Sequence, residues 1–163
     1  MASFPSSEGM DPEIMADYRQ IYQRSIADPE GFWRDAATAI SWQVPPTRIL
    51  DDGEAPIFLW FPDAELNTSY NALDRHIEAG NGDRVALIYD SPVTGTGRSY
   101  TYGELRDEVA RFAGALASLG VGKGDRVIVY MPMGVEGVVA MQACARIGAT
   151  HSVVFGGFSA KSI

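Results

Sequence analysis

A glycine-rich turn near the end of the sequence is the best candidate for chemistry. Phe155, Gly156 and Gly157 follow a predicted strand at 150–155, and Ser159 behind them is a residue type that caps helices. Glycines let backbone amides approach a ligand closely, and the start of a helix favours an anion. Open α/β sheets bind ligands at the carboxyl ends of their strands. The pattern predicts an anion-binding turn, with an ordinary tight turn as the alternative.

Two other glycine-rich segments lack the order that a phosphate site needs. Residues 120–124 follow a predicted helix and precede a strand, whereas a phosphate cradle places its amides at the start of a helix. Residues 94–97 fit the tip of a hairpin. The sequence contains neither a G-x-x-x-x-G-K-[ST] loop nor a G-x-G-x-x-G segment after a strand. Both segments are therefore predicted to be turns.

The remaining reactive side chains favour structural roles. Cys144 lies in an apolar run and is predicted to be a buried packing residue. His76 and His151 are far apart in sequence and have no neighbouring ligands, which argues against a metal site. Four carboxylates on predicted helices are expected to be solvated surface charges: Asp74, Glu104, Asp107 and Glu108. The sequence therefore predicts no catalytic residue and no metal site within this chain.

Composition excludes several classes of protein. The chain has 163 residues, 46% of them hydrophobic, and a net charge of −8 from 13 basic and 21 acidic residues. Without a basic stripe, a nucleic-acid partner is not expected. No apolar run approaches the roughly 18 residues that cross a membrane, and no signal peptide is recognisable. The sequence therefore predicts a cytoplasmic globular α/β protein, and it does not determine the oligomeric state.

Two kinds of segment make up the chain. Residues 1–10 are predicted to be a flexible leader. Residues 11–80 contain helices that begin at repeated Asp-Pro-Glu signals, an extended proline-rich stretch with a short strand at 57–61, and a helix from 67 to 80. Residues 81–163 contain a hairpin and then a long amphipathic helix with Leu105, Val109, Phe112, Leu116 and Leu119 on one face.

The last part of the chain predicts a parallel βαβ unit. A strand at 126–131, a helix at 135–147 and a strand at 150–155 follow one another, and a new helix is expected to begin at Ser159. Parallel sheets are normally covered on both faces and rarely have only two strands. The sequence therefore predicts an incomplete α/β domain with an exposed apolar edge, whose missing part lies C-terminal.

Several segments together resemble one enzyme family. The sequence is similar to AMP-forming short-chain acyl-CoA synthetases of the acetyl-CoA synthetase type, and residues 86–102 look closer to propionyl-CoA synthetase. The resemblance covers residues 15–163 and rests on these motifs: Tyr18-Arg-Gln-Ile-Tyr22, Asp28-Pro-Glu-Gly-Phe-Trp33, Leu66-Asn-Thr-Ser-Tyr-Asn-Ala-Leu-Asp-Arg-His76, Gly122-Lys-Gly-Asp-Arg126, Ala143-Cys-Ala-Arg-Ile-Gly-Ala149 and His151-Ser-Val-Val-Phe-Gly-Gly-Phe158.

The resemblance implies an architecture and a reaction. Residues 11–80 correspond to the N-terminal extension of the family, and residues 81–163 to the truncated start of its adenylation domain. The family activates propionate or acetate with ATP and Mg²⁺ as an acyl-AMP and transfers the acyl group to CoA. Its Phe-Gly-Gly turn contacts the nucleotide end of CoA, which maps onto Phe155, Gly156 and Gly157.

The same resemblance implies that the chain alone is inactive. The phosphate loop, the acyl pocket and the adenine site of the family lie downstream of residue 163, so no bound cofactor is expected here. The alternative is a non-catalytic module that binds a partner through its exposed sheet edge.

Overall fold

The structure, a computed structural model, describes residues 12–158 and 161, with side chains from residue 17 onward. The predicted leader at 1–10 and the helix expected from Ser159 lie outside the described residues. The chain divides into two compact units. One contains residues 1–40 and 44–65, and the other contains residues 41–43 and 66–163.

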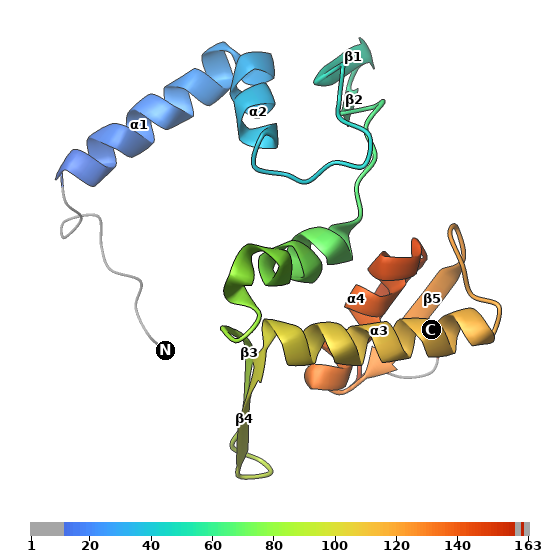
Figure 1. Cartoon of the computed structure of the whole chain (residues 1–163). Helices are drawn as coiled ribbons and strands as arrows, with labels where there is room; N and C mark the ends of the chain where they lie inside the picture. Colours follow the sequence, from blue (N-terminus) through green and yellow to red (C-terminus); the bar gives the residue numbers. More distant parts are fainter. Residues whose placement is uncertain (1–11, 159–160, 162–163) are drawn as a thin grey trace. The chain divides into compact units, whose positions relative to one another are not determined.

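The first unit pairs two helices with a short hairpin (Figure 1). It contains α1 (Pro12–Ala27), α2 (Pro29–Ala37), β1 (Leu50–Glu54) and β2 (Ile57–Trp60), and the two strands pair antiparallel. The Asp28 carboxylate caps α2 by accepting the Gly31 amide at 3.0 Å. The rings of Trp33 and Trp60 meet edge to face at 5.9 Å, which ties α2 to β2.

One carboxylate, that of Asp63, joins two parts of the proline-rich segment by hydrogen bonds. Asp63 accepts the backbone amides of Thr47 at 3.0 Å and Arg48 at 3.3 Å, and also the Thr47 hydroxyl. The hydroxyl bond from Thr47 holds the pKa of Asp63 below its ordinary value. Strand β2 lies where a strand was predicted, so this part of the segment is extended, and all four of its residues are exposed.

The second unit contains a hairpin, two long helices and a parallel strand pair. The helix predicted from 67 to 80 is present as one helical run from 68 to 81, in which residues 70–74 and 77–81 are π-helical. Gly80, with a positive φ of 82°, departs from helical geometry next to the end of this run. The elements are η2 (Tyr70–Asp74), η3 (Ile77–Asn81), β3 (Val85–Ser91), β4 (Thr96–Thr101), α3 (Tyr102–Ser118), β5 (Arg126–Met131), α4 (Val135–Ile147) and β6 (Thr150–Phe155).

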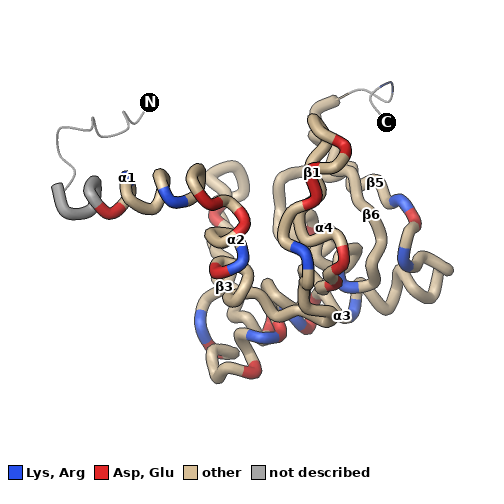
Figure 2. Tube along the Cα trace, turned by 90° about the horizontal axis from the view of Figure 1, so that it is seen from above, with Lys and Arg blue, Asp and Glu red and all other residues tan. Residues whose placement is uncertain are grey.

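The predicted βαβ unit is confirmed with its bounds. Strands β5 and β6 lie side by side and parallel, with pairs from Arg126 opposite Thr150 to Met131 opposite Phe155 (Figure 2). Helix α4 connects them and ends at Gly148, whose φ of 76° is the left-handed conformation that a residue with a Cβ rarely adopts. Parallel pairing places the carboxyl ends of both strands at one edge.

The core of this unit lies between α3 and α4, which pack side by side (Figure 1). Val109 and Ala143 are fully buried there, with Leu73 and Leu105 beside them. The predicted apolar face of α3 is correct for Leu105 and Val109 but wrong for Leu119, which is 80% exposed. Leu119 lies at the cap position after Ser118, the last residue of α3, and Phe112 is itself 38% exposed, so only part of the predicted face is covered.

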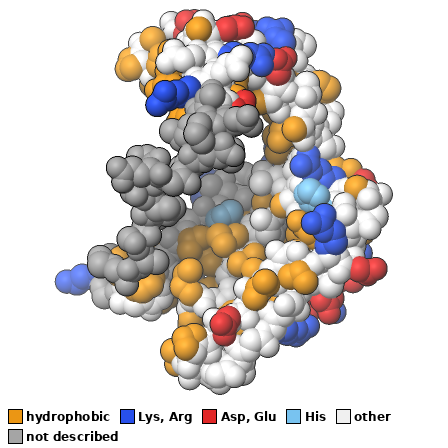
Figure 3. Space-filling view, turned by 90° about the vertical axis from the view of Figure 1, so that its left-hand side faces the viewer, with side chains coloured by type: hydrophobic (Ala, Val, Ile, Leu, Met, Phe, Trp, Pro, Cys, Tyr) orange, Lys and Arg blue, Asp and Glu red, His pale blue; other side chains and the backbone are white. Residues whose placement is uncertain are grey.

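Much of the apolar surface of the β5–β6 sheet is exposed. Val129 on β5 is 2% exposed, but its neighbour Val153 on β6 is 54% exposed. Ile128 and Tyr130, which alternate with Val129 along β5, are also exposed. Apolar side chains on both faces of this strand pair are therefore exposed. Hydrophobic side chains are also visible at the molecular surface in Figure 3.

The start of α3 gives a test of local folding. The Thr101 hydroxyl accepts the Glu104 amide at 3.2 Å while the Glu104 carboxylate accepts the Thr101 amide at 2.9 Å, which makes a capping box. Thr101→Ala should lower the free energy of unfolding by about 1 kcal/mol in urea titrations. Thr101→Ser, which keeps the hydroxyl, should lose less than half of that; equal losses would contradict the assignment.

Candidate functional site

The candidate turn is tied to the end of β5. The Phe158 amide donates to the Phe155 carbonyl at 2.9 Å, which closes the turn. The Tyr130 hydroxyl donates to the Phe158 carbonyl at 2.6 Å. The rings of Phe155 and Phe158 meet edge to face at 5.5 Å, and both side chains are more than half exposed. The turn therefore presents two aromatic surfaces on a backbone that β5 holds in place.

The two glycines of the turn have different surroundings. A Cβ on Gly156 would lie 3.0 Å from the carbonyl oxygen of Met131, a backbone atom with little freedom to move. A Cβ on Gly157 would instead meet the Phe155 ring at 2.8 Å, a side chain that can rotate. Gly156 is thus required by the close approach of two strand ends, whatever the turn binds. Its role in ligand binding remains a prediction.

The predicted anion site needs the helix that is expected from Ser159, and residues 159 and 160 lie outside the described part of the chain. The helix expected from Ser159 would supply the positive end of a helix dipole, and its first residues are not described. What the described turn offers is aromatic: the side chains of Phe155 and Phe158 are more than half exposed and contact each other edge to face.

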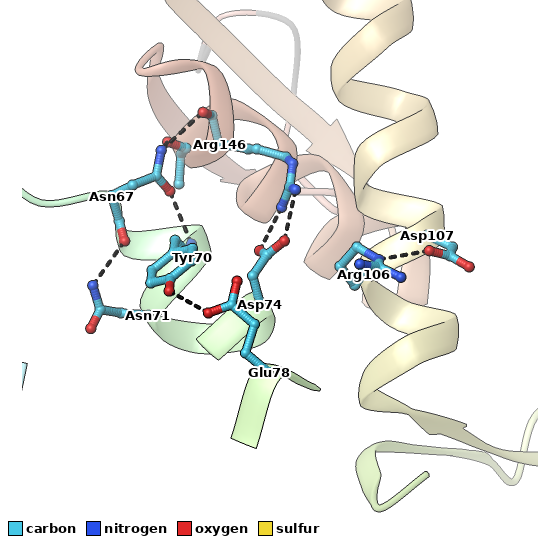
Figure 4. Close-up of polar contacts among 9 residues, drawn as sticks. Asn67, Tyr70, Asn71, Asp74, Glu78, Arg106, Asp107 and Arg146 are labelled. Atoms are coloured by element: carbon cyan, nitrogen blue, oxygen red, sulfur yellow. Dashed lines mark hydrogen bonds and ion pairs between the residues drawn. The ribbon is translucent and has the colours of Figure 1, made fainter. Parts of the chain in front are cut away.

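Asp74 was predicted to be a solvated surface charge, and this prediction is wrong. Its carboxylate forms a two-pronged ion pair with the Arg146 guanidinium, at 2.7 Å from Nη1 and 2.8 Å from Nη2 (Figure 4). The Asp74 side chain is only 14% exposed. The hydrogen bonds from Arg146 hold the pKa of Asp74 below its ordinary value, so the pair stays ionised at neutral pH.

The other predicted surface carboxylates have local partners. Asp107 accepts from Arg106 at 2.7 Å and Glu108 pairs with Arg111 at 2.6 Å, while Glu104 belongs to the capping box. These exposed pairs contribute little to stability.

Cys144 and the histidines are placed as packing residues. Cys144 is fully buried in α4, and burial raises the pKa of its thiol, which keeps it neutral. The His76 ring packs against Tyr102 at 5.0 Å, and His151 is half-buried in β6. Among the described side chains, His, Cys, Asp and Glu do not gather in any group of three that could hold a metal.

The described trace does not separate basic from acidic residues into regions of one sign. Basic and acidic residues are interspersed rather than separated (Figure 2). Within residues 12–158, every helix is too short or too polar to cross a bilayer.

Comparison with known families gives two adjoining matches. Residues 18–72 match the family described as acetyl-coenzyme A synthetase N-terminus. Residues 73–163, more than half of the chain, match the family described as AMP-binding enzyme. The chain belongs to the AMP-binding enzyme family. The boundary between the two matches falls within η2, so one compact unit of the chain contains residues from both matched regions.

Relatives of the chain include bacterial acetyl-coenzyme A synthetases. That of Thiobacillus denitrificans is 59% identical over 165 residues, which cover 98% of this chain and 25% of the relative. That of Paraburkholderia phymatum is 53% identical and covers 100% of this chain and 24% of the relative. The chain therefore spans about a quarter of the length of these relatives. The predicted resemblance to the N-terminal part of acetyl-CoA synthetases is confirmed.

A solved structure supports the fold. The acetoacetyl-CoA synthetase from Streptomyces lividans matches 86% of this chain and 22% of its own, with a TM-score of 0.76 and 32% sequence identity. The predicted fold class, a helical N-terminal extension followed by the start of an adenylate-forming α/β domain, is confirmed.

The strand-end geometry predicts different costs for the two glycines. Gly156→Ala should lower the free energy of unfolding by about 1–3 kcal/mol, because its Cβ meets backbone that has to shift. Gly157→Ala is the matched control and should cost less, because the Phe155 ring can turn aside. Urea unfolding of both variants checks this, and equal costs would show that Gly156 is not held by the strand ends.

Proposed function

We propose that this chain is the N-terminal part of an ATP-dependent acyl-CoA ligase. In the proposed reaction, the carboxylate of a short-chain acid attacks ATP at its α-phosphate, which forms an acyl-AMP and releases pyrophosphate. The thiol of CoA then attacks the acyl carbon and AMP leaves. Membership of the AMP-binding enzyme family and the identity to acetyl-coenzyme A synthetases support this proposal.

The proposed contribution of the chain is one wall of the CoA site. The observation that carries this is the turn at the carboxyl end of β6, held by Tyr130 and built around the packed Gly156. Strand ends of open α/β sheets are where ligands bind. In this proposal the exposed Phe155 ring stacks on the adenine of CoA, and Gly156 and Gly157 let the nucleotide approach the backbone.

The chemical step itself is proposed to use groups outside this chain. The described residues offer no cluster of carboxylates that fits Mg²⁺, so we assign the binding of that ion to the longer enzyme. Carboxylate activation needs donors that offset phosphate charge, and no phosphate loop occurs in these 163 residues. ATP and the carboxylate are therefore assigned to the longer enzyme.

The carboxylate is proposed to be acetate or propionate. The names of the relatives favour acetate, whereas the likeness of residues 86–102 to propionyl-CoA synthetase favours propionate. That segment forms β3, β4 and their connecting turn in this structure. Both candidate substrates are small aliphatic carboxylates.

The alternative is a module that binds a partner through the edge of β6. The exposed Val153 and Phe155 are the observation in its favour. Nothing in the described residues indicates what would cover that face, so the ligase is the function we retain.

A chimera tests the proposed function. In it, this chain replaces the matching quarter of the T. denitrificans acetyl-coenzyme A synthetase. We expect the chimera to form AMP in a reaction that needs acetate, ATP and CoA. Phe155→Ala should raise the KM for CoA about tenfold, since removing a stacked base costs about 1–3 kcal/mol. The KM values for acetate and ATP should stay within twofold.

Val93→Ala is the matched control for this experiment. Val93 is 94% exposed at the hairpin tip, so its truncation should change none of the three KM values. A folded chimera without AMP formation would refute the ligase proposal. If the chimera is active and Phe155→Ala leaves its KM for CoA unchanged, the proposed CoA site is refuted while the ligase proposal stands.

The chain by itself should show no acetate- or propionate-dependent exchange of pyrophosphate into ATP. The reason is that it carries no phosphate loop, so no group offsets the charge that develops on ATP. Radiolabelled pyrophosphate exchange with the purified 163-residue protein measures this directly. Carboxylate-dependent exchange above the buffer rate would contradict the assignment of ATP to the longer enzyme.

A further inference from the structure

One side chain caps two helices of the second unit. The Asn67 side-chain amide donates to the carbonyls of Arg146 at 3.0 Å and Ala145 at 3.4 Å, in the last turn of α4. Its side-chain oxygen accepts the Tyr70 amide at 3.0 Å, at the start of η2 (Figure 4). Both ends of a helix leave backbone groups without intrahelical partners, so Asn67 satisfies a donor of one helix and acceptors of another.

The neighbouring polar residues strengthen this contact. Asp74, about two turns beyond Asn67, holds the Arg146 guanidinium by two hydrogen bonds. Asn71, between them in sequence, exchanges two bonds of 2.9 Å with the backbone of Ser41. The side chains therefore join three separate stretches of chain through bonded atoms.

The carbonyls that Asn67 caps belong to the junction between α4 and β6. Gly148 takes the left-handed turn at the end of α4, and the Ala149 amide donates back to the Cys144 carbonyl at 2.9 Å. The next amide, of Thr150, already donates to Asp125 at 2.8 Å as β6 begins. A contact that fixes the last turn of α4 thus fixes the point from which β6 starts.

We propose that Asn67 is a positioning residue that caps η2 and α4 at once and so sets the start of β6. Asn67 lies in the region matched to the acetyl-coenzyme A synthetase N-terminus, whereas Arg146 lies in the AMP-binding region. The end of the N-terminal region therefore holds the last turn of α4, a helix of the AMP-binding region. This proposal does not depend on which ligand the Phe155–Gly157 turn binds.

Asn67→Asp separates the two capping roles. Aspartate keeps the oxygen that accepts the Tyr70 amide and is a good helix N-cap. It loses the donor to α4 and places a negative charge beside carbonyls at the negative end of that helix. If Asn67 capped only η2, this variant would behave as wild type. If it caps both helices, only the α4 end should loosen.

Native-state amide exchange of the 163-residue chain, followed by NMR, measures this. In Asn67→Asp we expect protection of the Gly148, Ala149 and Thr150 amides to fall about tenfold, the effect of losing a capping bond and adding an unfavourable charge. The Tyr70 amide and the α3 amide of Val109 should keep their protection.

Two further variants control the experiment. Asn71→Asp makes the same chemical change one turn away and should leave the α4 end within twofold of wild type. Arg146→Lys keeps the charge but not the two-pronged bond, and should loosen the same α4 amides by about threefold. Unchanged protection at Ala149 in Asn67→Asp would overturn the proposal, and so would an equal loss at Val109.

Discussion

The close approach of the carboxyl ends of β5 and β6 is the constraint on which the candidate site depends. Gly156 lies against the Met131 carbonyl, so a side chain at this position would push the two strand ends apart. The same approach brings the Tyr130 hydroxyl to the Phe158 carbonyl. The turn is therefore held by backbone packing and two hydrogen bonds, and its aromatic side chains are more than half exposed.

That approach requires α4 to be placed correctly between the two strands. Ala140, Ala143 and Cys144 are small and buried, which lets α4 pack closely on α3. At its far end α4 is fixed by Asn67 and by the ion pair of Asp74 with Arg146. Residues matched to two different families thus cooperate in one packed unit, and the family boundary is not a structural boundary.

Local signals in the sequence predicted much of the second unit. The bounds of α4 and β6 follow from apolar runs that end before Gly148 and Gly156, and β5 ends before Pro132. Gly156 and Gly157 were predicted as a candidate site because they follow a strand, and their role in binding stays a prediction.

What sequence reasoning missed involves partners far apart in the chain. Asp74 and Arg146 are separated by 72 positions, and Asn67 and Arg146 by 79, so no local pattern reports either contact. The exposure of Leu119 was missed for a similar reason, because periodicity defines an apolar face but not how much of it a neighbour covers. The spacing of Asn67, Asn71 and Asp74 on one helical face was the available signal.

A structure of the chimeric synthetase with CoA bound would show whether the turn at residues 155–157 is part of the CoA site. We expect the adenine nucleotide of CoA to lie within about 4 Å of Phe155, Gly156 and Gly157, the range of packed contacts. A nucleotide bound elsewhere, with this turn exposed to solvent or covered by protein, would contradict it.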